Sequence, residues 1–189
     1  MTRLAECLLP LIDPDTDKAI GMVKEVLAEY MPAYEIAFQS MMLKKLGVYG
    51  CSQEGRDVET FIKTFLQLME DKKLDYTIAF IDLADSLSCS QKEAYLRDMF
   101  GDWYSQWRQW IGDSTQEALD CMSKINPLLI PRNHHVEAML ARCENSLSCD
   151  TDHPFLLALK SPYTFTPHTA AYQDVPEDGD RNYKTFCGT

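Results

Sequence analysis

Apolar side chains recur every three or four residues along most of the chain, and this period constrains its fold more than any other feature. The longest example comprises Ile20, Val23, Leu27, Met31, Tyr34, Phe38 and Met41. Such spacing places side chains on one face of an α-helix, whereas strand signals are scarce along the sequence. The pattern therefore predicts an all-α fold.

The helix boundaries follow from local signals. Residues 3–12 predict a first helix, and Thr16 begins a long second one, in which Pro32 is expected to introduce a kink or a division into two. Gly47 is expected to end it, because glycine adopts the backbone conformation that follows many helices. Further helices are predicted over residues 58–69, 76–83, 90–110, 114–125, 136–143 and 154–159, with an interruption at residue 101.

Two of these helix starts carry a capping-box pattern. Ser90 is followed by Glu93, and Ser114 by Glu117. In a capping box the serine side chain accepts a hydrogen bond from a backbone N–H, and the glutamate reaches back to the cap. The spacing predicts that helices begin at both serines.

The segment NPLLIPRNHH, residues 126–135, is the connector around which these helices are organised. Proline disfavours helical geometry in the residue before it, so Pro127 is expected to end one helix and Pro131 to begin the next. One interpretation is a linker whose three aliphatic residues fill a core. The other is that Arg132 and Asn133 form a polar clasp that holds the C-terminal tail or another domain.

We expect two regions along the chain: a helical domain over residues 1–160 and an irregular tail over residues 161–189, which ends in a cysteine-containing FCGT. The tail combines prolines and acids with five aromatic residues, more than a purely disordered segment contains. It is therefore predicted to lie along the helical body, or along a part of the protein that this chain does not contain.

The aromatic cluster DWYSQWRQW allows two interpretations. Trp103, Trp107 and Trp110, together with Arg108, could stack nucleic-acid bases. A net charge of −11 and a pI of about 4.7 oppose a nucleic-acid surface, because phosphate binding requires a basic face. The helical spacing favours packing in the core.

No apolar run approaches the roughly 20 residues that cross a membrane, so no membrane partner is expected.

Signals for chemistry are sparse. The seven cysteines include no C-x-x-C pair, which favours reduced thiols in a cytosol-like compartment. Glycine-rich phosphate loops, nucleophile elbows and zinc-protease motifs do not occur in the sequence. A zinc site could be drawn from Cys149, His153, His168 and either His134 or His135, but the spacing matches no known ligand frame. We predict no catalytic, cofactor-binding or metal-binding residues in this chain.

Five segments do resemble a known family. They are MMLKKLGV, DYTIAFIDL, NPLLIPRNHHVEAM, LKSPYTF and YKTFCGT, and in order and spacing they are similar to the C-terminal part of selenoprotein O and its bacterial YdiU-type relatives. The resemblance implies a multi-helix C-terminal portion of a protein-kinase-like (pseudokinase) fold. Members of the family transfer AMP from ATP to serine, threonine or tyrosine hydroxyls of proteins, so ATP and Mg²⁺ are implied for a longer parent and no cofactor for this chain.

The family's nucleotide-binding and metal-binding residues have no counterpart here, so the chain alone is expected to be inactive. Its implied partners are an upstream kinase-like domain and the parent's protein substrates. Family members carry a cysteine or selenocysteine as the third residue from the C-terminus, and Cys187 occupies that place. The resemblance therefore implies a redox-regulatory role for Cys187. Met1 is expected not to be a natural start.

The implied location is the bacterial cytoplasm, or the mitochondrion for a eukaryotic protein. The alternative is a self-standing helical interaction module without enzymatic activity. The reading frame upstream in the gene distinguishes the two, because a glycine-rich loop and a metal-binding Asp/Asn pair there would support the first.

Overall fold

A computed structural model describes residues 2–48, 50, 55–146 and 153–176. These residues form helices and connecting turns, with no β-strand among them. The chain divides into two compact units, residues 1–43 and residues 44–189, and each is described by itself. The predicted all-α content is confirmed for this part of the chain.

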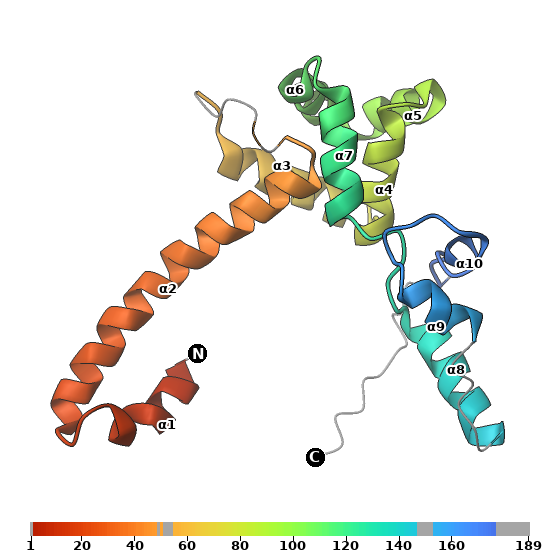
Figure 1. Ribbon diagram of the computed structural model, residues 1–189. Coiled ribbons are helices and arrows are strands. Elements are labelled where there is room, and N and C mark those ends of the chain that lie inside the picture. Colours follow the sequence, from red (N-terminus) through yellow and green to blue (C-terminus); the bar gives the residue numbers. More distant parts are fainter. Residues whose placement is uncertain (1, 49, 51–54, 147–152, 177–189) are drawn as a thin grey trace. The chain divides into compact units, whose positions relative to one another are not determined.

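The first unit contains α1 (Thr2–Ile12) and nearly all of α2 (Thr16–Lys45), joined by a short acidic turn. The Asp15 carboxylate accepts hydrogen bonds from the backbone N–H groups of Asp17 and Lys18, at 3.0 and 3.3 Å, and so satisfies donors at the start of α2. The predicted division at Pro32 is wrong, since α2 continues through that proline as one 30-residue helix (Figure 1).

The second unit holds the remaining helices. Their bounds are α3 (Val58–Asp71), α4 (Tyr76–Ser86), α5 (Ser90–Phe100), α6 (Asp102–Ile111), α7 (Thr115–Ile125), α8 (Asn133–Ser146), α9 (Pro154–Leu159) and α10 (Pro167–Ala170). Helix α4 packs against α5 and α7, α6 against α3 and α5, and α9 against α10 (Figure 1). The predicted interruption at Gly101 is confirmed, because this residue, with φ of 55°, separates α5 from α6.

The helices α5 and α7 begin close to the predicted positions, but the prediction that Ser90 and Ser114 form capping boxes is wrong. Ser90 is the first residue of α5 rather than its cap, and Ser114 caps α7 without a side-chain hydrogen bond. The caps that do form use other residues. The Asp57 carboxylate accepts from Thr60 N–H at 3.0 Å at the start of α3, and Asp75 accepts from Ile78 N–H at 2.9 Å at the start of α4.

Three tryptophans lie at the centre of the second unit's core. Trp103, Trp107 and Trp110 are all buried, and Trp107 is fully so. The indole N–H of Trp107 donates to the Leu46 carbonyl at 2.8 Å, and that of Trp103 donates to the Phe61 carbonyl at 3.0 Å. Both polar atoms are therefore satisfied inside the core. The core interpretation of this cluster is confirmed, and a base-stacking platform is excluded because its rings are not accessible.

Gly47 ends the long helix as predicted. Its φ of 68° lies in the left-handed region, and its N–H donates to the Lys44 carbonyl at 3.1 Å. A Cβ at this position would lie 3.0 Å from Ala118 Cβ and from the Met122 side chain. Glycine is therefore required both for the turn and for the close approach of α7.

The expected C-terminal portion of a protein-kinase-like fold is wrong for this chain. The all-helical content reflects the apolar period, which fixes the type of element but not how successive helices are arranged.

Candidate functional site

The connector carries the least exposed of the ion pairs found among the described residues, and it joins the start of α8 to the start of α4. The Arg132 guanidinium, 7% exposed, donates to both carboxylate oxygens of Asp75, at 2.8 and 2.9 Å. Two parallel charge-assisted hydrogen bonds of this kind fix orientation as well as distance. Arg132 therefore holds α4, while its backbone carbonyl accepts from Val136 N–H in the first turn of α8.

Asp75 performs two tasks with one carboxylate, since it pairs with Arg132 and also caps α4. The hydrogen bonds from Arg132 hold the pKa of the Asp75 carboxyl below its usual value, with a further contribution from the Ile78 backbone N–H, and partial burial opposes them. The carboxylate is thus kept ionised, as the pair requires.

The connector is also tied to the chain that follows residue 160. The N–H groups of Leu128 and Leu129 donate to the Pro162 carbonyl at 2.7 and 3.3 Å. The Gln173 side-chain amide donates to the Leu128 carbonyl at 2.8 Å, and Leu129 is buried. The described part of the tail therefore lies against the helical body, as predicted. The domain boundary at residue 160 stays a prediction.

A second polar contact anchors the connector's start. The Asn126 amide donates to the Lys45 carbonyl at 2.7 Å, so the connector holds the C-terminal end of α2 within the second unit. Lys45 itself is buried, with its ammonium 4.3 Å from the centre of the Phe80 ring, and burial lowers the pKa of this lysine.

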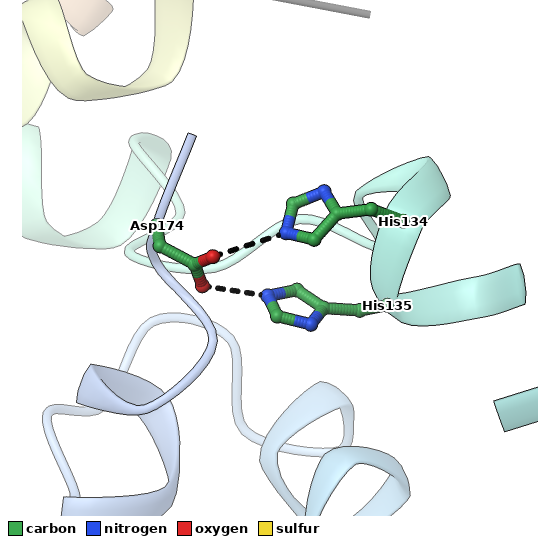
Figure 2. A group of neighbouring side chains, drawn as sticks. All are labelled: His134, His135 and Asp174. Atoms are coloured by element: carbon green, nitrogen blue, oxygen red, sulfur yellow. Dashed lines mark hydrogen bonds and ion pairs between the residues drawn. The ribbon is translucent and has the colours of Figure 1, made fainter. Parts of the chain in front are cut away.

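Two adjacent histidines at the start of α8 converge on one carboxylate (Figure 2). His135 Nε2 lies 2.7 Å from Asp174 Oδ1, and His134 Nε2 lies 3.2 Å from Asp174 Oδ2. Partial burial raises the pKa of Asp174, but the hydrogen bonds from His135 and His134 lower it by more, so the net pKa is below the usual value. These three side chains are the candidate site for chemistry.

The sequence did not predict this group. The zinc set drawn from the sequence contains Cys149, His153, His168 and only one of His134 and His135, and it does not contain Asp174. His153 instead caps α9 through Nδ1, which accepts from Phe155 N–H, and His168 lies in α10. Cys149 and Cys187 lie outside the described residues. The adjacent histidine pair was the one available signal, because Asp174 is one acid among several in the tail.

Asn133 is the first residue of α8 and is half-buried, and its predicted part in the clasp stays a prediction. A pocket of about 290 Å³ lies nearby between α4 and α7, lined by apolar side chains with Asp85 and Asp120 and by no basic residue. Nucleotide phosphates require basic groups or backbone cradles, so this pocket does not fit ATP.

Comparison with known proteins yields a clear match. The family model described as protein adenylyltransferase SelO matches residues 1–158. The protein nucleotidyltransferase YdiU of Teredinibacter turnerae is 38% identical over the whole chain, that of Anoxybacillus flavithermus 36% and that of Pelagibacter ubique 34%.

The chain spans about 39% of the length of the curated relatives it matches. With this coverage, the prediction that the chain is a C-terminal portion of a kinase-like fold is wrong. Among the described residues, no helix combines the length and the apolar character needed to cross a bilayer.

Proposed function

We propose, from the premise that this chain belongs to the protein adenylyltransferase SelO family, that it is a helical portion of an enzyme that transfers AMP from ATP to serine, threonine or tyrosine hydroxyls of proteins. The observation that carries the proposal is the family match over residues 1–158. In this account the chain supplies structural support, and the nucleotide binds to the rest of the parent protein.

The described residues agree with a supporting role. The pocket between α4 and α7 lacks basic groups, and the five glycines with positive φ lie singly at turns and helix ends rather than in one phosphate-binding loop. ATP and Mg²⁺ are therefore proposed as ligands of the parent alone, and no chemical step is assigned to residues of this chain.

What the chain contributes is a rigid junction. The Arg132–Asp75 pair, the Asn126–Lys45 contact and the Leu128–Pro162 bond converge on one connector. Such a junction fixes the angle between successive helices, and the parent would depend on it to hold its nucleotide-binding part in place. The partners proposed for the chain are accordingly the rest of the same protein and, through it, the protein substrates. We also propose a cytoplasmic location, because the seven cysteines of the sequence include no C-x-x-C pair, which favours reduced thiols.

The test is AMP transfer from α-labelled ATP to a protein acceptor, measured with the full-length parent, the parent carrying Arg132→Met, and this chain alone. The parent should label the acceptor, the variant should label it more slowly in proportion to its loss of folded protein, and the chain alone should label nothing. A parent that hydrolyses ATP without labelling any protein would contradict the proposed reaction.

Redox regulation through Cys187 is a second part of the proposal, and it is supported by the resemblance of the segment YKTFCGT, in which Cys187 lies, to the corresponding family segment. Two thiols would form a disulfide and pass two electrons and two protons to a disulfide-containing oxidant. In the full-length parent, oxidation should then lower AMP transfer in the wild type but not in Cys187→Ser. Equal activity of both proteins under oxidising and reducing conditions would remove this role.

The alternative, a helical interaction module without enzymatic activity, is favoured by one observation. The first unit exposes large apolar side chains along its helices, among them Leu11 at 82%, Val26 at 71% and Ile36 at 71%. In this alternative the occupant of the surface is a separate protein, whereas in the first proposal it is the rest of the longer parent. If Val26→Glu and Ile36→Glu leave the parent's stability and activity unchanged, the occupant is a separate protein and the alternative gains support.

A further inference from the structure

We propose that His134, His135 and Asp174 form a binding site for a divalent transition-metal ion of the zinc class. Each residue offers one ligand atom, and the three atoms all lie within 4.8 Å of one another. Figure 2 shows both imidazole rings directed at the same carboxylate from the start of α8. Nothing in the proposed nucleotidyltransferase function uses these side chains.

The donor set determines the class of ion. Two imidazole nitrogens and one carboxylate oxygen suit zinc, cobalt, nickel or ferrous iron, whereas magnesium and calcium prefer oxygen ligands alone. Zinc bonds to nitrogen and oxygen are about 2.0–2.2 Å long, which puts two ligands of a tetrahedral ion roughly 3.3–3.6 Å apart. An ion would therefore replace the direct hydrogen bonds and move His135 Nε2 away from Asp174 Oδ1, from which it is now 2.7 Å distant. Three protein ligands leave a fourth position, which water would fill.

Burial selects the coordinating nitrogen of His134. Its Nδ1 is buried and has no hydrogen-bond partner, so it cannot reach an ion from solvent. Its Nε2 faces Asp174, as does that of His135. On metal binding the proton on each Nε2 moves to Nδ1 or to solvent, and the nitrogen lone pair forms the new bond.

The supports of the three ligands are already in place. Helix α8 is fixed at its first turn by Arg132, which Asp75 holds. The His135 ring packs edge-on against Tyr172 at 5.0 Å, and Gln173 binds the Leu128 carbonyl, so the backbone on the N-terminal side of Asp174 is anchored twice. A metal bound here would therefore link α8 to the segment that follows α10, which is 39 residues further along the chain.

One effect opposes the site. The N-terminal end of a helix carries partial positive charge, which disfavours a cation near the first turn of α8. The Asp174 carboxylate, whose pKa is lowered and which is therefore ionised near neutral pH, offsets this repulsion. The balance favours a site of moderate affinity that the protein could load and release, rather than a permanently filled structural centre.

The experiment titrates the tag-free, reduced 189-residue chain with Co²⁺ and with Zn²⁺, measuring bound metal by equilibrium dialysis and the melting temperature alongside it. The wild type should bind one ion per chain and melt at a higher temperature when loaded. Asp174→Asn and His135→Gln should each lower the affinity at least tenfold, since loss of outer partners alone costs tenfold or more. His168→Gln is the matched control and should bind as the wild type does.

Asp174 is 60% exposed in its side chain, so its substitution leaves the fold intact and provides the decisive variant. Binding that persists unchanged in Asp174→Asn and His135→Gln but disappears after thiol alkylation would assign the metal to cysteines and overturn the proposal. No saturable binding of either ion below millimolar concentration would overturn it equally. A loss of affinity in both variants, with circular dichroism as in the wild type, would establish the site.

Discussion

Breaking the Arg132–Asp75 pair should destabilise the second unit strongly. Two substitutions measure separately the cost of an unpaired Asp75 and the cost of an unpaired Arg132. Arg132→Met keeps the volume but leaves Asp75, whose side chain is 22% exposed, without its cation. Asp75→Asn preserves the cap, since asparagine caps helices well, but leaves the 7% exposed Arg132 without an anion. Removing one partner of a buried pair costs about 3–5 kcal/mol.

The structure also predicts the order of these effects. Asp75→Asn should cost about 4 kcal/mol, because the remaining guanidinium is almost fully buried, and Arg132→Met about 3 kcal/mol, because the remaining carboxylate is partly exposed to water. The double variant should lose less than the sum of the two, since no unpaired charge remains. We expect a coupling of about 2 kcal/mol between the two sites.

Urea unfolding followed by tryptophan fluorescence measures these costs, because all three tryptophans lie in the second unit and report on it alone. A midpoint for Arg132→Met within experimental error of the wild type, with an unchanged slope, would refute the claim that this pair is buried and structural. Additive effects in the double variant would refute the direct contact.

The pair should also give stability a defined pH dependence. The folded-state pKa of Asp75 lies below its unfolded value of about 3.8, so its contribution is complete only above about pH 5. It should be lost as the pH falls through the lower folded-state pKa. Urea midpoints measured between pH 2 and pH 6 should therefore fall less steeply for Asp75→Asn than for the wild type.

Other substitutions test the core and the thiols. Trp107→Ala should cost about 3–5 kcal/mol by urea unfolding, and an unchanged melting temperature would contradict its burial. Gly47→Ala should cost more than Gly112→Ala, because both carry positive φ but only Gly47 has side chains within 3.0 Å. Cys121 should react with a thiol reagent more slowly than exposed Cys89, because burial raises its pKa; equal rates measured by mass spectrometry would contradict this.

The sequence predicted the type and approximate bounds of most helices because apolar side chains at helical spacing lie on one face of a helix, although the longest such face, in α2, is largely exposed. The tryptophan cluster is the clearest case, since its period and the acidic charge both pointed to the core. Pro32 did not divide α2 as expected. Loss of one backbone hydrogen bond is insufficient to break a helix that continues in both directions.

Contacts between distant residues could not be predicted from local patterns. Nothing in the sequence pairs Asp75 with Arg132, 57 residues away, although both were within segments recognised from the family. The grouping of Asp174 with His134 and His135 depends on how the chain turns after α10, and a lone acid in a proline-containing segment carries no such signal. The predicted roles of Asn133 and Cys187 stay predictions.

Calorimetric titration of Mg-ATP into the purified chain tests most directly the central claim that it supports a nucleotidyltransferase without binding the nucleotide. The account predicts no saturable heat up to millimolar ATP, with or without Mg²⁺, whereas the full-length parent titrates normally. Saturable, magnesium-dependent binding to this chain at micromolar ATP would contradict the account and place a nucleotide site within these 189 residues.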